Sequence, residues 1–280
     1  MKIAETATDI RKLLAPHRAK SRIALVPTMG CLHEGHLSLI RKAHEVADIV
    51  VVSIYVNPMQ FGQNEDLDAY PRTLDTDAAA CKAEGVEHLF HPENLYREGG
   101  PKVTLTVAEL ADCLCGKSRL GHFDGVATVV NILFNIIQPD VAVFGEKDWQ
   151  QLAIIRRMVR DLHMPVEVIG APTVREKDGL AMSSRNRFMD KDKRFISKEL
   201  NASLRSIDDV YIKGERSASA LIASGHSYLA EHGIEPEYLE IRTASDLQSI
   251  EHLNGVVARA FVAAKVGSAR LIDNIALETL

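Results

Sequence analysis

The sequence predicts an α/β protein in which a doubly wound parallel sheet is followed by a second, smaller α+β domain. Short runs of β-branched residues alternate with segments of helical periodicity through the first two-thirds of the chain. Strands that alternate with helices in this way pair in parallel, with helices packed on both faces of the sheet. After about residue 176 the alternation ends. A chain of 280 residues is long enough to bury most of its apolar surface in one large domain or two modest ones.

Five apolar runs are expected to form the buried strands of the parallel sheet. The runs are short and, apart from residues 88–91, rich in β-branched residues, which is typical of strands covered on both faces. The runs are residues 23–26, 49–56, 88–91, 141–144 and 166–169.

Helices are expected between these strands. Residues 35–47 carry an apolar stripe at helical spacing, and residues 126–137 are apolar enough to form a packed helix. A further helix opens after the strand at 141–144 and continues to residue 162. The stripe of the first helix consists of Leu37, Ile40, His44 and Ala47.

The last third of the chain is expected to form a different kind of unit. Residues 177–179 form a turn, and the stretch from 187 to 198 is highly charged. Two helices and three extended segments follow, which predicts a mixed α+β domain. The helices are expected near 197–212 and 217–232, and the extended segments at 238–242, 256–266 and 270–274. We therefore expect domains at 1–176 and 177–280, with a hinge near residues 175–180.

Composition narrows the class of function. The formal net charge is −5 and the longest basic block is Arg156-Arg157, so the clustered positive charge that neutralises nucleic-acid phosphates is missing from the sequence. The N-terminus has no apolar leader pattern, and no run of about 18 apolar residues occurs. We therefore expect a cytoplasmic protein that binds neither membranes nor nucleic acid. The spacing of the cysteines favours neither a zinc site nor a redox-active dithiol. They are Cys31, Cys81, Cys113 and Cys115.

A pair of histidines follows the first strand, at the crevice where open α/β sheets bind ligands. His33 and His36 are three residues apart, so both imidazoles lie on nearly one face of the helix start, beside backbone N–H groups that favour anions. Such a pair can donate hydrogen bonds to a phosphate as its charge grows. The spacing of a His-Glu-x-x-His zinc site does not fit, whereas a purely helix-capping role for both rings stays open.

Polar residues also follow the second strand and the strand at 141–144. Gln60 offers a donor and an acceptor that suit a substrate with hydroxyl and carboxylate groups, although a solvent-facing loop residue is equally consistent, as it is for Tyr70. Gly145 permits close backbone approach, Lys147 supplies a positive charge for phosphates, and Asp148 can accept hydrogen bonds from ribose hydroxyls. The alternative is a solvated helix start capped by Asp148.

A fourth polar cluster follows a hairpin whose turn is Asp178-Gly179. Ser183, Ser184 and Arg185 place two hydroxyls and a guanidinium within reach of one phosphate. The alternative is that Ser183 caps a helix and Arg185 makes a surface ion pair. A Gly-x-Ser-x-Gly nucleophile elbow and a Walker motif are both missing from the sequence, so any ATP site must be of another kind.

These residues resemble two known groups of proteins. His33-Glu34-Gly35-His36 resembles the HxGH signature of the nucleotidyltransferase superfamily, whose Rossmann-like domain transfers nucleotidyl groups from nucleoside triphosphates. Six longer strings, in order and in approximate spacing, resemble the pantothenate synthetase family over nearly the whole chain. The strings are Pro27-Thr28-Met29-Gly30, Tyr55-Val56-Asn57-Pro58-Met59-Gln60-Phe61, Phe144-Gly145-Glu146-Lys147-Asp148, Val174-Arg175-Glu176, Met182-Ser183-Ser184-Arg185-Asn186 and Ala269-Arg270-Leu271-Ile272-Asp273-Asn274.

The resemblance implies an ATP-dependent ligase. ATP and pantoate would give pantoyl-adenylate and pyrophosphate, and β-alanine would then attack the activated carbonyl to release pantothenate and AMP. Mg²⁺ would be carried by the ATP phosphates, with no metal ligand assigned in the protein. The resemblance further implies a homodimer, and a hinge near Glu176 suggests that the smaller domain closes as a lid over the nucleotide.

The same resemblance assigns roles to individual residues. Catalytic roles fall to His33, His36, Lys147, Ser183 and Arg185. The ATP-binding residues are Met29, Gly30, His33, His36, Gly145, Lys147, Asp148, Val174, Met182, Ser183, Ser184 and Arg185. The pantoate-binding residues are Asn57, Gln60, Tyr70, Arg119 and Gln151.

The chain departs from the wider superfamily at its second signature, Lys-Met-Ser-Lys-Ser. Residues 181–185 lack the first lysine, so Lys147 or Arg185 must supply the charge, and Trp149 stands where the family is expected to have Tyr or Phe. Three rival functions stay open. They are another HxGH nucleotidyltransferase, such as one that acts on a phosphate acceptor, an aminoacyl-tRNA-synthetase-like or RNA-binding module, and a purely structural or interaction protein.

Overall fold

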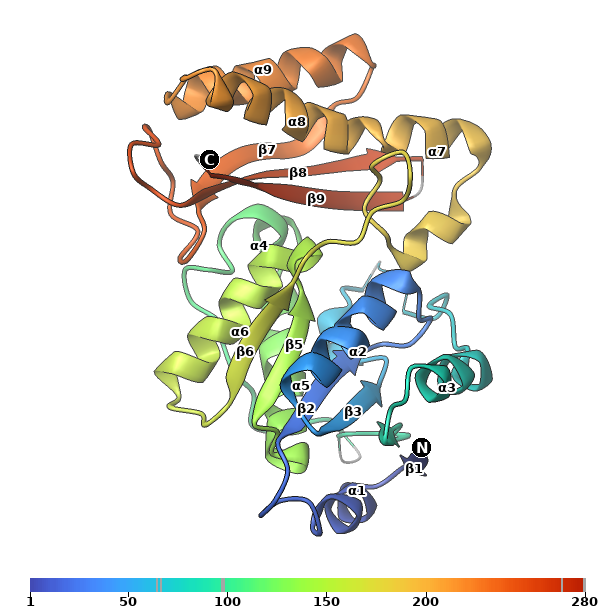
Figure 1. Cartoon of the computed structure of the whole chain (residues 1–280). Coiled ribbons are helices and arrows are strands. Elements are labelled where there is room, and N and C mark those ends of the chain that lie inside the picture. Colours follow the sequence, from blue (N-terminus) through green and yellow to red (C-terminus); the bar gives the residue numbers. More distant parts are fainter. Residues whose placement is uncertain (64, 66, 97–98, 268, 279–280) are drawn as a thin grey trace.

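A six-stranded parallel sheet forms the N-terminal part of the protein in the computed structural model, which describes residues 1–63, 65, 67–96, 99–267 and 269–278 (Figure 1). The strand order is β1-β4-β3-β2-β5-β6, and every pairing is parallel. The predicted doubly wound sheet is thus confirmed. Its strands are β1 Lys2–Ala4, β2 Ile23–Thr28, β3 Ile49–Ile54, β4 His88–Phe90, β5 Val141–Gly145 and β6 Glu167–Ala171.

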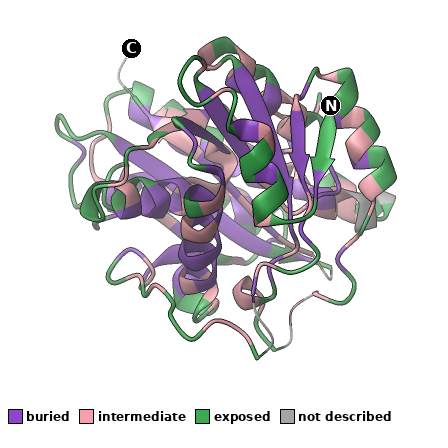
Figure 2. Cartoon of the chain, turned by 90° about the horizontal axis from the view of Figure 1, so that it is seen from below, coloured by how far each residue is buried: buried purple, intermediate pink, exposed green. Residues whose placement is uncertain are grey.

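Helices cover both faces of this sheet because successive strand residues point to opposite sides. Ile23 and Leu25 of β2 pack with α1, α5 and α6 in one apolar cluster, whereas Ala24 and Val26 pack with α2 and α3 in another. Figure 2 shows the buried strands between helices that are exposed on their outer sides. The helices are α1 Ala7–Leu14, α2 Glu34–Val46, α3 Leu74–Ala83, α4 Leu114–Ser118, α5 His122–Ile137 and α6 Trp149–Asp161.

Some elements differ from the expectation. Strand β1 has only three residues, two of them exposed, so it carries no readable periodicity. Helix α3 is weakly amphipathic, with Asp77 among its few buried residues, so it too lacks a clear pattern. In α2 the buried residues are Leu39, Ile40 and Ala43, so the predicted stripe is rotated, and of its four members only Ile40 is fully buried.

The C-terminal part has its own sheet and its own apolar core. Strands β7 Pro236–Thr243, β8 Ala258–Val266 and β9 Ala269–Leu277 pair antiparallel in the order β7-β8-β9. Helices α8 and α9 pack on this sheet, on the side away from the parallel one (Figure 1). The helices of this part are α7 Lys191–Ser197, α8 Glu199–Ile212 and α9 Ala218–Glu231. Residues 268, 279 and 280 of the expected second domain lie outside the described residues.

Within the described ranges, every helix is too short or too polar to span a bilayer. Two short 3₁₀ turns, η1 Pro58–Gln60 and η2 Glu146–Asp148, follow β3 and β5, and a third, η3 Ser184–Phe188, precedes α7. These turns carry many of the polar side chains that the sequence singles out.

Gly125→Ala is expected to destabilise the fold. Helix α5 lies directly on η1, and a Cβ at residue 125 would stand 2.4 Å from the Met59 carbonyl oxygen. Backbone atoms cannot move aside cheaply, so we expect a loss of about 1–3 kcal/mol in the free energy of unfolding, measured in urea. Gly62→Ala is the control, because its Cβ would meet only the Glu65 side chain at 3.7 Å. Equal stability of the two variants would contradict the packing argument.

Candidate active site

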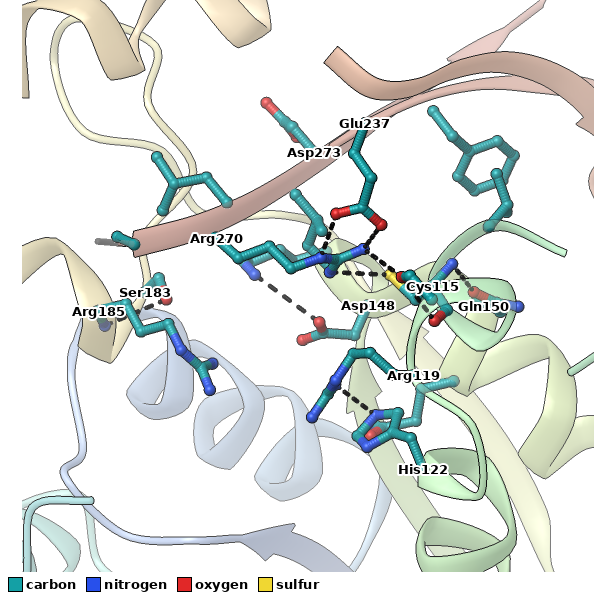
Figure 3. A pocket seen from close by; sticks show the side chains of 18 of the residues that line it. Cys115, Arg119, His122, Asp148, Gln150, Ser183, Arg185, Glu237, Arg270 and Asp273 are labelled. Atoms are coloured by element: carbon teal, nitrogen blue, oxygen red, sulfur yellow. Dashed lines mark hydrogen bonds and ion pairs between the residues drawn. The ribbon is translucent and has the colours of Figure 1, made fainter. Parts of the chain in front are cut away.

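Two adjoining cavities lie at the carboxyl edge of the parallel sheet, and the larger one is also lined by residues of the C-terminal strands. Their volumes are about 900 and 210 Å³, and they adjoin each other because they share wall residues. Figure 3 shows the larger cavity, with Ser183 and Arg185 on one side and Arg119 and His122 on another. The shared residues are Arg119, His122, Lys147, Asp148, Gln151, Ser183 and Arg185.

The smaller cavity gathers almost all of the predicted site residues. Every residue that the sequence assigns to ATP or pantoate lines it, except Gly30 and Asn57. These residues come from separate segments, which follow β2, β3, β4, β5 and β6. The convergence predicted from the parallel topology is therefore present, and Gly30 and Asn57 have other positions that are described below.

Both histidines are held by the start of helix α2. The Nδ1 atom of His33 accepts a hydrogen bond from the Gly35 N–H at 3.1 Å, and Nδ1 of His36 accepts one from the His33 N–H at 3.3 Å. The capping role that the sequence left open is thus real. Each ring accepts its capping hydrogen bond at Nδ1. A neutral imidazole that accepts at Nδ1 carries its proton on Nε2, so Nε2 is the donor atom of each ring.

The two rings form a close pair with 4.1 Å between their centroids. Burial lowers the pKa of His36 to about 3, and the neighbouring His33 contributes to this lowering, so His36 is neutral at pH 7. Gly35 makes this arrangement possible, since a Cβ there would lie 2.9 Å from Cε1 of His33. The pair therefore offers neutral N–H donors rather than positive charge.

The turn before His33 is fastened by a residue that the sequence pattern does not single out. Asp77 of α3 is 2% exposed, and its carboxylate accepts hydrogen bonds from the N–H groups of Cys31 and Leu32, both at 2.8 Å. Gly30 adopts a φ of +83°, and a Cβ there would stand 3.0 Å from the Asp77 carboxylate. Gly30 therefore shapes the turn and lines neither cavity.

The segment after β3 presents Gln60 to the cavity. Asn57 is 1% exposed and lies beneath, donating from Nδ2 to the Gln60 Oε1 atom at 3.1 Å and to the Gly125 carbonyl at 3.1 Å. The Gln60 amide nitrogen lies 3.1 Å from the sulfur of Met29. Gln60 is thus a fixed cavity residue and not a solvent-facing loop residue, and Asn57 holds it in place from outside the cavity.

The remaining pantoate candidates line the same small cavity. Tyr70 is buried and meets Phe61 edge to face, with 6.0 Å between ring centroids. Arg119 makes two hydrogen bonds of 2.6 Å to the Glu65 carboxylate. Gln151, on the first turn of α6, lines both cavities.

The segment after β5 brings a cation and a carboxylate to the cavity. The Lys147 side chain is 21% exposed, and its Nζ atom lies 3.7 Å from Asp148 Oδ1. Asp148 stands at the N-cap position of α6 without a capping hydrogen bond from its side chain, so the predicted capping alternative is not realised there. A Cβ at Gly145 would meet only Leu39, at 3.9 Å, so the protein itself leaves that backbone open to a ligand.

Trp149, the aromatic residue at which the chain differs from the family expectation, connects the two parts of the protein. Its indole N–H donates to the Ala244 carbonyl at 2.8 Å. The guanidinium of Arg259 lies 3.7 Å from the centre of its ring. The indole therefore uses both its polar edge and its face to hold the C-terminal sheet.

The fourth cluster is carried by the predicted hairpin. Arg175 and Ala181 form an antiparallel β-bridge, and the Met182 N–H donates to the Val174 carbonyl at 2.9 Å. Gly179, with a φ of +92°, forms the turn. Ser183 caps η3 by accepting from the Arg185 N–H at 3.3 Å, so this capping alternative is realised. Ser184 and Arg185 still line the small cavity.

Together these features define an α/β protein with a cavity at the carboxyl edge of its sheet, lined by three histidines, a lysine and two arginines. In the described part of the chain, no group of three or more His, Cys, Asp or Glu side chains is arranged to hold a metal ion. A family model described as pantoate-beta-alanine ligase matches residues 2–276, and the chain belongs to this family of enzymes.

Individual relatives agree over nearly the full length. The chain is 48% identical to a pantothenate synthetase of Pseudomonas putida, with 98% of this chain and 97% of the relative covered. The crystal structure of pantothenate synthetase from Thermus thermophilus superposes with a TM-score of 0.93 at 41% identity, covering 99% of both chains. A pantoate-beta-alanine ligase of Francisella tularensis, complexed with beta-gamma ATP and beta-alanine, gives a TM-score of 0.82 at 34% identity, covering 100% and 98%.

The neutral state of His36 predicts a pH-dependent stability. The unfolded chain takes up this proton near the ordinary pKa of 6.5, whereas the folded chain does so only near 3. The unfolded state therefore binds more protons between these values, and stability falls as the pH decreases from about 6.5. The slope contributed by one such group is at most about 1.4 kcal/mol per pH unit. Urea unfolding at several pH values should show a shallower slope for His36→Asn, and equal slopes would refute the buried neutral ring.

Proposed function

We propose that the protein condenses pantoate with β-alanine to pantothenate through a pantoyl-adenylate, with release of pyrophosphate and AMP. The observation that carries the proposal is the convergence of the site residues on the smaller cavity. Its lining puts the donors and cations suited to a polyphosphate next to the wall formed by Gln60, Tyr70 and Gln151. Membership of the pantoate-beta-alanine ligase family supports the same reaction.

In the first step a pantoate carboxylate oxygen attacks the α-phosphorus of ATP, and the bond from phosphorus to the pyrophosphate oxygen breaks. Both reactants are anions, so the protein must align them and offset their repulsion. His33 and His36 donate from Nε2 to the phosphates, and Lys147 and Arg185 supply positive charge. Fixed donors of this kind stabilise charge that develops in the transition state.

In the second step the amine of β-alanine attacks the acyl carbon, the bond to AMP breaks, and the amine loses a proton to solvent. Gln60 and Gln151 hold the pantoate hydroxyl and carboxylate oxygens, and Tyr70 and Arg119 complete that wall. The ribose lies against Gly145 and Asp148. Met29, Val174, Met182, Ser183 and Ser184 complete the nucleotide site.

Several finer points belong to the same proposal. Asp148 is the one carboxylate among the described residues that line the small cavity, and it lies beside Lys147, so Mg²⁺ enters with the ATP phosphates. The unit formed by residues 177–280 closes as a lid over the nucleotide site carried by residues 1–176. The protein works as a homodimer in the cytoplasm.

The proposed reaction is tested by its two halves. Without β-alanine, we expect pantoate-dependent exchange of labelled pyrophosphate into ATP. Addition of β-alanine should then release AMP in equal amount to pantothenate. Exchange that does not depend on pantoate, or pyrophosphate release that is never followed by AMP, would point instead to another nucleotidyltransferase.

His33→Ala and His36→Ala are expected to slow adenylate formation about 10²–10³-fold, because each removes one fixed donor at a developing charge. Single-turnover measurements of the first half-reaction check this, with circular dichroism to verify folding. His226→Ala, an exposed histidine on α9, is the matched control. A wild-type rate in either cavity variant refutes the assignment.

Gly145→Ala is expected to weaken ATP binding while it leaves the fold intact. The added methyl group meets no protein atom closer than 3.9 Å, so it can clash only with a bound ligand. We expect the KM for ATP to rise about 10-fold or more and the KM for pantoate to stay unchanged. An unchanged KM for ATP would remove Gly145 from the nucleotide site.

A further inference from the structure

His122 joins two parts of the pantoate wall that the sequence assigns separately. Its Nδ1 atom lies 2.7 Å from the main-chain carbonyl oxygen of Gln60, and its Nε2 atom lies 2.8 Å from Nη1 of Arg119. Figure 3 shows the contact with Arg119 on the cavity wall. His122 also lines both cavities, at their junction.

The partners of His122 allow only one protonation state. A carbonyl oxygen can only accept, so Nδ1 must carry the proton, and a guanidinium can only donate, so Nε2 must accept. The ring is therefore neutral with both nitrogens engaged. Burial, reinforced by the charge of Arg119, lowers the pKa of His122 to about 4, in agreement with this state. Such a ring has no free lone pair for proton transfer, which argues against a role as a catalytic base.

Arg119 is held as firmly as the histidine. Its Nε and Nη2 atoms each donate to the Glu65 carboxylate at 2.6 Å, and Nη2 lies 3.3 Å from the Gln60 carbonyl. The guanidinium charge is thus already balanced by Glu65. Arg119 consequently serves as a brace for the Gln60 carbonyl and for His122, more than as a free cation for a substrate carboxylate.

The turn that carries Gln60 is anchored at two ends, and only one end depends on His122. Asn57 donates to the Gly125 carbonyl at 3.1 Å, and the backbone of Met59 lies directly against Gly125, so the first end is fixed by α5 packing. The end that bears Gln60 is fixed by His122 and Arg119. Loss of the imidazole should therefore loosen the main chain at Gln60 and shift its side chain, which Asn57 and Met29 contact only at its tip, while the rest of the turn stays in place.

We propose that His122 is a positioning residue for pantoate, which sets the pose of Gln60 by joining its carbonyl to the Arg119–Glu65 pair. The proposal rests on the function proposed above. It assigns a role to a histidine outside the HxGH pair and identifies hydrogen bonding, not charge or proton transfer, as what the ring contributes.

The test uses three variants of the full chain. His122→Ala removes both hydrogen bonds, His122→Asn keeps a donor near the Nδ1 position, and His122→Gln keeps an acceptor near the Nε2 position. We expect His122→Ala to raise the KM for pantoate about tenfold, with the KM for ATP changed less than about twofold. His122→Asn should recover most of the loss and His122→Gln little of it. The exposed control His226→Ala should leave both constants unchanged.

Several outcomes would overturn the proposal. They are an unchanged KM for pantoate in His122→Ala, equal rises in both KM values, or equal behaviour of the Asn and Gln variants. If His122→Ala does not fold, the comparison of Asn with Gln still decides, because only the Asn variant places a donor near the Gln60 carbonyl. A wild-type enzyme without pantoate-dependent pyrophosphate exchange would refute the proposed function itself, which is a separate result.

Discussion

Parallel pairing of β2 with its neighbours is the constraint on which the site depends. Thr28 at the end of β2 lies opposite Ile54 at the end of β3, and Gly145 of β5 lies opposite Ala171 of β6. Because all these strands run in one direction, the segments that follow them leave the sheet at the same edge. A slip of one residue in this register would turn each strand's side chains to the other face and move the loops apart.

The second sheet completes the site through buried polar contacts. Asn274 of β9 donates from Nδ2 to the Lys147 carbonyl at 2.9 Å, and Arg175 of the hairpin donates to both carboxylate oxygens of Asp273, at 2.6 and 3.0 Å. Buried polar groups are costly unless they are paired, so these contacts resist separation. This explains why the string at residues 269–274 resembles the family although it contributes no proposed catalytic group. Any closure of the C-terminal unit has to preserve or exchange these pairs.

The sequence was sufficient for the features that depend on local pattern, and insufficient for those that depend on distant partners. Short apolar runs identified five of the six strands of the parallel sheet, and polar residues at strand ends identified the cavity. Asp77 and Glu65 escaped notice because each acts on a residue far along the chain, 46 positions from Cys31 and 54 from Arg119. Asn57 and Gly30 were found by pattern, yet their places outside the cavity follow only from packing in three dimensions.

Around the small cavity the two histidines at the start of helix α2 are neutral, and the positive charge lies on other residues. This arrangement follows from the way that helix begins. Two imidazolium rings 4.1 Å apart would repel one another, whereas two neutral rings can share the first turn of the helix and still face one cavity. Backbone N–H groups hold each ring through Nδ1, so the phosphate contacts proposed for Nε2 would require no rearrangement of the rings. Positive charge comes instead from Lys147 and Arg185, which lie on other segments, beside the second sheet. The neutral donors thus belong to the first turn of α2, and the charged groups belong to the segments that follow β5 and β6.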